Sequence, residues 1–242
     1  MAEDGSLSLG VLAVAETLRI SAPTVLDAML GRLTREACDR RLASWSRRLV
    51  EEMAVKLDVH GLSNVPSDGE TFVLMSNHQS HFDIPVLFRV VPGSMRMVAK
   101  TELYRIPVFG RALHAAEFIE VDRSDKQRSR ESIEVAKNRL RSGVHVWIAP
   151  EGTRSTTGKL GAFKKGGFVL ALDTHTRILP ITLDGTRFVV RPHQNRLHRG
   201  QRVRIEFHPP IDPASYGFER RDALVADVRA AIASSLPEEL RG

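Results

Sequence analysis

Short apolar runs alternate with longer helical patterns along most of this sequence, and the alternation constrains the fold more than any other feature. Apolar runs of this kind suit strands buried on both faces, and amphipathic segments between them suit helices that cover a sheet. The predicted strands are Leu57–His60, Phe72–Ser76, Arg96–Ala99, Phe118–Val121, Val144–Ala149, Ile178–Leu183 and Val203–Phe207. This rhythm predicts an α/β domain with a mostly parallel or mixed sheet of about seven strands covered by helices.

Helical patterns fill the intervals between the predicted strands. They are clearest over Ser124–Arg141 and Phe163–Thr174, and a last amphipathic helix contains Leu224, Val228 and Ile232. In such folds the chemical groups usually lie in loops just past the ends of strands. Those loops are therefore where we expect the functional residues.

The first 55 residues read as a separate helical segment, which we expect to precede a catalytic domain over residues 56–242. Two apolar stripes have helical spacing, the first formed by Val25, Leu26, Met29, Leu30 and Leu33, the second by Cys38, Leu42, Trp45, Leu49 and Met53. Arg40, Arg41, Arg47 and Arg48 lie opposite the second stripe. That helix either rests in a lipid interface or packs on its own domain, and the pattern alone leaves both interpretations open.

Composition and cysteine content exclude several classes of protein. The chain has 242 residues, of which 42% are hydrophobic and 26% charged, so it can bury a core and is not mainly disordered. Cys38 is the only cysteine, which excludes an intrachain disulfide and favours the reducing cytoplasm. No uninterrupted apolar run approaches the roughly 18 to 20 residues of a membrane span, so we expect no crossing of the bilayer.

The charge balance points to an anionic partner. The net charge is +6, and six arginines with no acidic residue lie between Arg187 and Arg204, an excess equal to that of the whole chain. A membrane-facing or donor-phosphate surface over residues 187–204 is our hypothesis for this excess. Nucleic-acid binding is disfavoured, because the stretch has one aromatic residue, Phe188, and no recognisable reading motif.

A histidine and an aspartate follow the strand Phe72–Ser76 in the segment Asn77-His78-Gln79-Ser80-His81-Phe82-Asp83. Five residues apart in a loop that enters a helix, His78 and Asp83 can approach through space. A carboxylate that accepts one imidazole N–H fixes the tautomer and makes the other nitrogen a better base, which can activate a hydroxyl nucleophile. His81, two residues from Asp83, is expected only to shape the loop.

Charged residues also follow other predicted strands. Pro150-Glu151-Gly152-Thr153-Arg154-Ser155 comes after Val144–Ala149, and Lys100 and Arg123 come after two further strands. The planar guanidinium of arginine can bind two phosphate oxygens together. An ion pair that stabilises the turn is the alternative for Glu151 and Arg154. Repetition of cations after successive strands favours one anion-binding pocket.

These motifs, taken in order from about Val55 to Pro210, resemble the glycerolipid acyltransferase family of the NHxxxxD type, especially its bacterial 1-acylglycerol-3-phosphate acyltransferase branch. Asn77–Asp83 resembles the first block, Phe118–Arg123 the second, Pro150–Ser155 the third and Ile178–Ile181 the fourth. Ala99–Leu103 and Phe163–Gly167 resemble the stretches between blocks.

The resemblance implies a role for each matched residue. His78 is the expected general base and Asp83 its partner. Acceptor binding is expected of Lys100, Arg123, Glu151, Gly152, Thr153 and Arg154, while Pro180 shapes the acyl-donor region. The family uses acyl-CoA or acyl carrier protein as co-substrate and implies no further cofactor, and no metal site is expected because His78 and Asp83 lack a convincing third ligand.

The implied reaction moves an acyl group to the sn-2 hydroxyl of 1-acylglycerol 3-phosphate and makes phosphatidic acid. The lipid acceptor implies a cytoplasmic protein, peripheral on the inner face of the cell membrane. Departures from the family pattern at Glu117, Ala149 and Arg177 leave the acyl pocket and the acceptor open. Glycerol 3-phosphate, another lysophospholipid or a lyso-aminolipid is an alternative acceptor, and a non-catalytic membrane-binding protein is the alternative of a different class.

Overall fold

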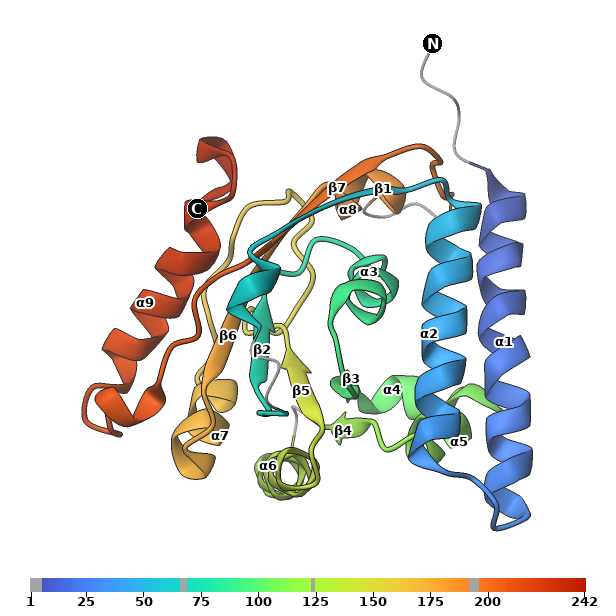
Figure 1. Cartoon of the computed structure of the whole chain (residues 1–242), viewed down its shortest axis with the longest axis horizontal. Coiled ribbons are helices and arrows are strands. Elements are labelled where there is room, and N and C mark those ends of the chain that lie inside the picture. Colours follow the sequence, from blue (N-terminus) through green and yellow to red (C-terminus); the bar gives the residue numbers. More distant parts are fainter. Residues whose placement is uncertain (1–5, 66–68, 123–124, 192–195) are drawn as a thin grey trace.

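One seven-stranded sheet organises the chain (Figure 1). The computed structural model describes residues 6–65, 69–122, 125–191 and 196–242. The strands are β1 (Lys56–His60), β2 (Val73–Ser76), β3 (Met95–Lys100), β4 (Ile119–Val121), β5 (His145–Ile148), β6 (Ile178–Asp184) and β7 (Arg202–Phe207). Their order is β1-β7-β6-β2-β5-β3-β4, and every neighbouring pair is parallel except β6 and β7. The predicted mixed, mostly parallel sheet is confirmed, with strand ends that differ from the prediction by one residue at most.

Helices occupy the intervals between strands. They are α1 (Leu7–Met29), α2 (Arg35–Glu52), α3 (Asp83–Val90), α4 (Thr101–Tyr104), α5 (Phe109–Ala115), α6 (Lys126–Arg141), α7 (Gly166–Thr174), α8 (Thr186–Val189) and α9 (Arg221–Ser234). Helix α6 begins where Asp125 caps it, accepting a hydrogen bond of 2.8 Å from the N–H of Gln127. The helices predicted around residues 124–141, 163–174 and 224–236 are therefore present.

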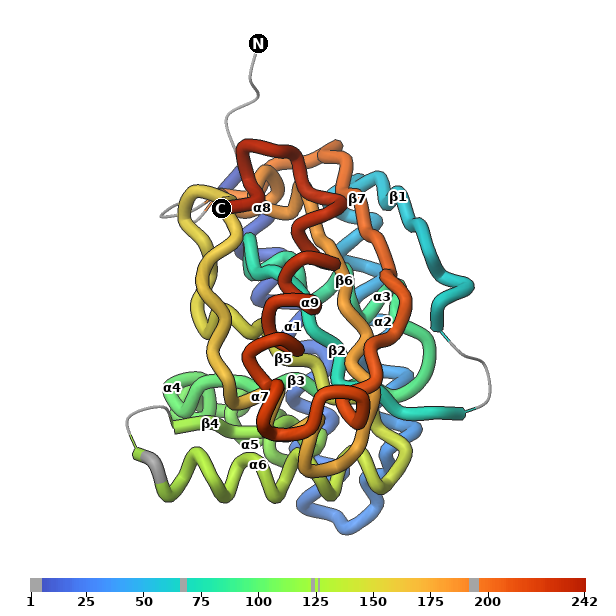
Figure 2. Tube along the Cα trace, turned by 90° about the vertical axis from the view of Figure 1, so that its left-hand side faces the viewer, coloured from blue at the N-terminus to red at the C-terminus, as the bar shows by residue number. Residues whose placement is uncertain are grey.

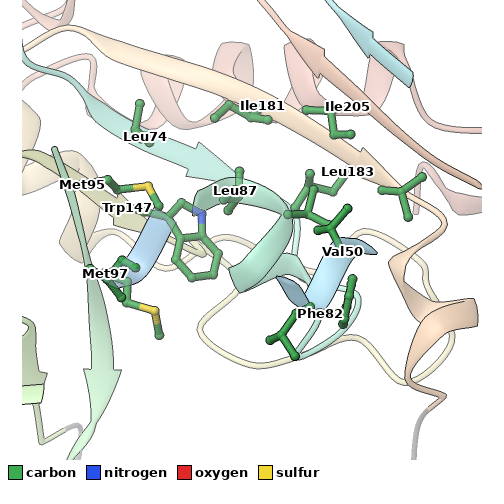
Figure 3. Close-up of a cluster of buried hydrophobic side chains, with 14 of the residues drawn as sticks. Val50, Leu74, Phe82, Leu87, Met95, Met97, Trp147, Ile181, Leu183 and Ile205 are labelled. Carbon is green, nitrogen blue, oxygen red and sulfur yellow. The ribbon is translucent and has the colours of Figure 1, made fainter. Parts of the chain in front are cut away.

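The central strands β2, β5 and β6 are covered on both faces, because they are buried along nearly their whole length. Alternate side chains of β2 point to opposite faces, so Leu74 joins the core under α2, α3 and α5, while Val73 and Met75 join the core under α6, α7 and α9. Figure 3 shows the first of these cores, in which Leu74, Trp147 and Ile181 from the strands meet Val50 and Leu87 from the helices. The fold is thus a three-layer α/β arrangement.

Helix α2 belongs to the core of the domain. Its apolar stripe is buried, with Cys38 3%, Leu49 3% and the adjoining Met53 0% exposed. The interpretation of α2 as the helix that rests in a lipid interface is therefore wrong. The periodicity identified the apolar face correctly, but α3 and the sheet cover that face.

Helix α1 has apolar side chains on its exposed surface and polar side chains among its buried residues, the reverse of the usual arrangement on a surface helix. It lies outside α2, packs on α2 and α5 (Figure 1), and buries Glu16, Ser21 and Thr24. Six of its large apolar side chains are exposed, namely Leu7, Val11, Val14, Leu18, Leu26 and Met29. The helix is also long and apolar enough to cross a membrane by length and composition, a property that the search for uninterrupted apolar runs did not detect. Scattered polar residues interrupt its apolar runs without making the whole helix polar.

The topology brings the ends of five strands to one edge of the sheet. Strands β2 to β6 run parallel to one another, so the residues that follow each of them meet at their shared carboxyl edge. The loop after β2, the turn after β5 and the turn after β6 all start there. This edge is where the structure collects the residues of the candidate site.

His145 of β5 and His208 after β7 are buried neutral histidines. The N–H of Phe72 donates to His145 Nδ1 at 3.0 Å, and His208 Nε2 lies 2.8 Å from the hydroxyl of Thr182. Burial lowers the pKa of both imidazoles below the ordinary value of 6.5. Since the unfolded chain binds those protons more readily, each histidine lowers the free energy of unfolding as the pH falls below about 6.5.

We therefore expect the free energy of unfolding to fall as the pH is lowered from 7.5 to 5.5, by up to about 1.4 kcal/mol per pH unit for each of the two histidines. Urea denaturation of the whole chain and of His145→Gln over this range measures the slope. The variant keeps a hydrogen-bond acceptor but has no titrating ring, so its slope is smaller. Equal slopes for the two proteins would exclude His145 as a source of the pH dependence.

Candidate active site

The loop from Asn77 to Asp83 is anchored to β6 by a side chain. Asn77 Nδ2 donates to the carbonyl of Leu183 at 2.7 Å, and the N–H of Leu183 donates to Asn77 Oδ1 at 2.8 Å. Beyond the Ser76–Ile181 register, the side chain of Asn77 therefore continues the pairing of β2 with β6. The two bonds fix the direction in which the loop leaves the sheet.

Asp83 is fully buried and accepts hydrogen bonds at both carboxylate oxygens. Its Oδ2 accepts from the N–H of Gln79 at 2.9 Å and of Ser80 at 3.1 Å, and its Oδ1 accepts from the hydroxyl of Thr186. Burial of a carboxylate without such partners is strongly unfavourable. The loop thus wraps around Asp83 and holds it rigidly.

His78 lies against this carboxylate. Its Nδ1 is 2.7 Å from Asp83 Oδ2, so the carboxylate holds the ring in the tautomer with the proton on Nδ1. Trp147 contacts the ring edge-on, with centroids 5.9 Å apart, and the side chain remains 17% exposed. In the neutral form of this tautomer Nε2 carries no proton, as a general base requires.

Glu151 connects two loops of the main chain. One of its oxygens, Oε1, accepts from the N–H of His78 at 2.8 Å, and the other, Oε2, accepts from the N–H of Gly161 at 2.8 Å. The side chain is buried, and this burial raises the pKa of the carboxyl against the opposing effect of the two N–H groups. Glu151 therefore fixes the backbone of His78, while its expected contact with an acceptor stays a prediction.

The other candidate residues occupy different positions around this pair. Lys100 is exposed at the end of β3, and Arg154 is half-buried after β5. Burial and the neighbouring charges of Arg154, His78 and Lys100 lower the pKa of His81, which indicates that both cations lie around the first loop. Arg123 lies outside the described residues.

Pro180 and the pair Gly152 and Thr153 are not at the His78 ring itself. Pro180 is buried inside β6, next to Met75 in the register, and its carbonyl accepts from the N–H of His208 at 3.0 Å. Gly152 and Thr153 line a cavity of about 500 Å³ between α6, α7 and the ends of β3 to β5. We call this space the α6–α7 cavity.

Two further spaces lie on the α1 side. An open groove of about 750 Å³, here the α1 groove, is lined by the first half of α1 together with His81, Pro85 and Arg154. A more enclosed apolar cavity of about 280 Å³, here the helix-pair cavity, lies between α1, α2, α3 and α5. Thr17, Trp45 and His81 line both spaces, so the two adjoin at the Asn77–Asp83 loop. His81, which was expected only to shape the loop, therefore also lines the α1 groove and the helix-pair cavity.

Two of the six arginines in the stretch from Arg187 to Arg204 form ion pairs, which the sequence did not indicate. Arg187 forms an ion pair with Asp184, and Arg204 forms one with Glu206, two acids that adjoin the stretch. Arg191, Arg196, Arg199 and Arg202 are exposed. In the described part of the chain, no three His, Cys, Asp or Glu side chains are grouped as a metal site needs.

Three supporting residues were missed from the sequence. Thr186 reaches Asp83 from 103 positions away, Gln79 Oε1 accepts from the N–H of Gly185 at 3.2 Å, and Asn77 spans to β6. One sequence feature could have identified Thr186. It lies two residues after the end of β6, a strand that ends at the shared edge where functional residues are expected. The partners of Asn77 are main-chain groups, and Gln79 binds the main chain of Gly185 as well as the side chain of Arg187, contacts that no residue pattern identifies.

Replacement of Asn77 by Ala is expected to lower the free energy of unfolding by about 2–4 kcal/mol, because it leaves the buried N–H and C=O of Leu183 without partners. Urea denaturation measures the change. Asn138→Ala, on the exposed side of α6, serves as the matched control and is expected to stay within about 0.5 kcal/mol of the unchanged chain. A similar small effect for both variants would show that the Asn77 bonds do not hold the loop.

Comparison with known proteins agrees with this arrangement. The family model described as Acyltransferase matches residues 56–184, more than half of the chain. The 1-acyl-sn-glycerol-3-phosphate acyltransferase of Escherichia coli is 30% identical over 177 residues, which cover 72% of this chain and 71% of that protein. A chloroplastic 1-acyl-sn-glycerol-3-phosphate acyltransferase of Arabidopsis thaliana is 33% identical over 181 residues, but the matched part spans about half of its length (49%).

A solved structure extends the similarity to the whole fold. The crystal structure of the 1-acyl-sn-glycerophosphate acyltransferase of Thermotoga maritima has a TM-score of 0.74, with 26% sequence identity and 92% of each chain covered. The similarity therefore extends over most of the chain and not only over the residues that the family model matches. On the family model and the bacterial relative together, this chain belongs to the acyltransferase family.

Proposed function

We propose that this protein transfers an acyl group from an acyl thioester to the sn-2 hydroxyl of 1-acylglycerol 3-phosphate, with His78 as the general base. The observation that carries the proposal is the 2.7 Å contact of His78 Nδ1 with the buried carboxylate of Asp83 at the edge where five parallel strands end. The relatives of Escherichia coli and Arabidopsis thaliana are 1-acyl-sn-glycerol-3-phosphate acyltransferases, which supports the choice of acceptor. Acyl-CoA and acyl carrier protein are both suitable thioester donors.

In the proposed step, His78 Nε2 takes the proton of the sn-2 hydroxyl while its oxygen attacks the thioester carbonyl carbon. A C–O bond forms, the C–S bond breaks, and the departing thiolate takes the proton from the imidazolium. The products are phosphatidic acid and the free thiol. The thioester is already activated, so the protein has to supply only a base and accurate positioning, without a covalent intermediate.

Asp83 supports this step by its charge and its rigidity. When His78 carries a second proton, the adjacent carboxylate stabilises the imidazolium. The bonds from Gln79, Ser80 and Thr186 keep that carboxylate in place, so no reorganisation is needed as the proton moves. Lys100, Arg123 and Arg154 are proposed to hold the phosphate, and the helix-pair and α6–α7 cavities offer apolar space for acyl chains.

His78→Ala is expected to lower turnover by about 10²–10⁴-fold while binding of the lysophospholipid acceptor is largely kept, because the base is lost and the acceptor pocket is not. An assay with purified protein, in which several lysolipids are crossed with both donor types, measures turnover. His60→Ala replaces an exposed histidine of β1 and is the matched control. Normal turnover in His78→Ala would exclude the assignment, and transfer to a different acceptor alone would keep the chemistry and replace the substrate.

We also propose that α1 places the protein on a membrane surface. The exposed residues Leu7, Val11, Val14 and Leu18 follow one face of the helix at spacings of three and four. The inward side carries buried polar groups beside Leu12 and Ile20, which pack on the core: Glu16 pairs with Arg19 and Arg48, and Asp27 with Arg32 and Arg41. An apolar surface of this length on the outside of a protein marks an interaction site, and the proposed lipid acceptor makes the cytoplasmic face of the cell membrane the natural partner.

The double variant Leu18→Glu with Leu26→Glu is expected to weaken binding to phosphatidylglycerol-containing vesicles by roughly tenfold or more, because two exposed leucines lose their apolar contact. Vesicle flotation measures the bound fraction. Val135→Glu, on an exposed apolar position of α6, is the control and is expected to bind as the unchanged chain does. Unchanged binding of the double variant would exclude α1 as the membrane contact.

A further inference from the structure

The segment after α9 is fixed to the loop between β5 and α7. The N–H of Leu160 donates to the carbonyl of Leu240 at 2.8 Å. The carbonyl of Leu160 accepts from Arg229 Nη2 at 3.3 Å, and the same nitrogen donates to the carbonyls of Arg241 (3.0 Å) and Gly242 (3.4 Å). Leu160 and Leu240 are both buried. Figure 2 shows the C-terminal end beside this loop, which follows β5 in the chain.

The same loop touches the Asn77–Asp83 loop, here called the catalytic loop, through Glu151. The N–H of Gly161, the residue after Leu160, donates to Glu151 Oε2 at 2.8 Å, and Glu151 Oε1 accepts from the N–H of His78 at 2.8 Å. A continuous series of contacts therefore leads from Arg229 and Leu240, through Leu160, Gly161 and Glu151, to the backbone of His78.

A second contact runs beside the first. Gly158 packs so closely on Arg187 and Leu240 that a Cβ there would lie 2.9 Å from Arg187 Cδ and 3.5 Å from Leu240 Cδ2. Arg187 Nη1 donates to Gln79 Oε1 at 3.2 Å. Two successive residues of the catalytic loop, His78 and Gln79, are thus each connected to the loop that the C-terminal segment holds.

We propose that Arg229 and the segment Glu238–Gly242 form a positioning element of the active site, which holds the Gly161 N–H on Glu151 and thereby the backbone of His78. The inference rests on the proposed function, in which His78 is the base. Arg229 touches none of the residues proposed to contact substrate, so it acts only through Leu160 and Gly161.

The physical reason lies in the burial of Glu151. A buried carboxylate keeps its charge and position only while its hydrogen-bond donors stay in place, and here the donors are two main-chain N–H groups from different loops. Loss of the Gly161 donor lets the carboxylate shift or take up a proton, and His78 then loses a fixed acceptor. A displacement of about 1 Å at a reacting group can lower the rate by about 10²-fold.

The first test is Arg229→Gln in the full chain, with lysophosphatidic acid and acyl-CoA as substrates. We expect kcat to fall by about tenfold with KM within about threefold of its original value, because the base is displaced while the acceptor pocket is intact. Arg229→Lys, which can still donate to the main-chain carbonyls, is expected to recover most of kcat. Arg141→Gln removes an exposed arginine at the end of α6 and is expected to change neither constant.

Two further variants separate positioning from a loss of folding. Gly161→Ala places a Cβ 3.0 Å from Glu151 Oε2 at a glycine without a left-handed φ, so the fold tolerates it while the carboxylate must move. We expect the same loss of kcat with an unchanged thermal midpoint. In a Glu151→Gln background, Arg229→Gln is expected to add no more than about twofold, because both changes break one series of contacts.

Hydrogen exchange gives a readout that does not need substrate. Arg229→Gln is expected to speed exchange at the amides of Gly161 and His78 and to leave the amides of β1 unchanged. Three results would each overturn the inference. They are an unchanged kcat in both Arg229→Gln and Gly161→Ala, a loss of kcat in the Glu151→Gln, Arg229→Gln double variant equal to the product of the two single losses, and unchanged exchange at the His78 amide. Absence of acyl transfer by the unchanged chain would instead count against the proposed function, and the exchange experiment would still decide the inference.

Discussion

The arrangement of the site depends on the hydrogen bonds that surround the buried carboxylate of Asp83. A carboxylate with no solvent contact must be surrounded by donors, and here the donors come from its own loop, from Thr186 and from His78. Thr186 follows β6, and the loop that contains Asp83 follows β2. The contact between Thr186 and Asp83 therefore requires that β2 and β6 pair in the sheet. The geometry of the His78–Asp83 pair is therefore a consequence of strand order as much as of the motif.

A second carboxylate, that of Glu151, extends the same principle to the main chain. It accepts from His78 and Gly161, so the loops after β2 and β5 are joined by one side chain. The two carboxylates divide the work, since Asp83 orients the imidazole ring and Glu151 fixes the backbone that carries it. The segment after α9 completes this framework through Leu160, which makes the far end of the chain part of the surroundings of the site.

The sheet and the first motif could be predicted because their signals are local. The apolar runs around β5 and β6 have no other stable placement than a covered sheet, and His78 and Asp83 are only five residues apart. The helices before the sheet were harder. The stripe from Cys38 to Met53 identified an apolar face on α2, but an apolar face suits lipid and a protein core equally well, and only the packing of α3 and the sheet decides between them.

By itself, the sequence determined the strands and the longer helices, the mixed α/β class and the pair of residues proposed as base and partner, because each of these depends on residue types a few positions apart. The tertiary structure alone decided that α1 turns its polar residues inward, that Glu151 binds two main-chain N–H groups, and that Thr186 reaches Asp83. These contacts join segments as far as 103 positions apart, and several end on backbone atoms. Backbone donors and acceptors are the same in every residue, so only the folded chain can specify which of them meet.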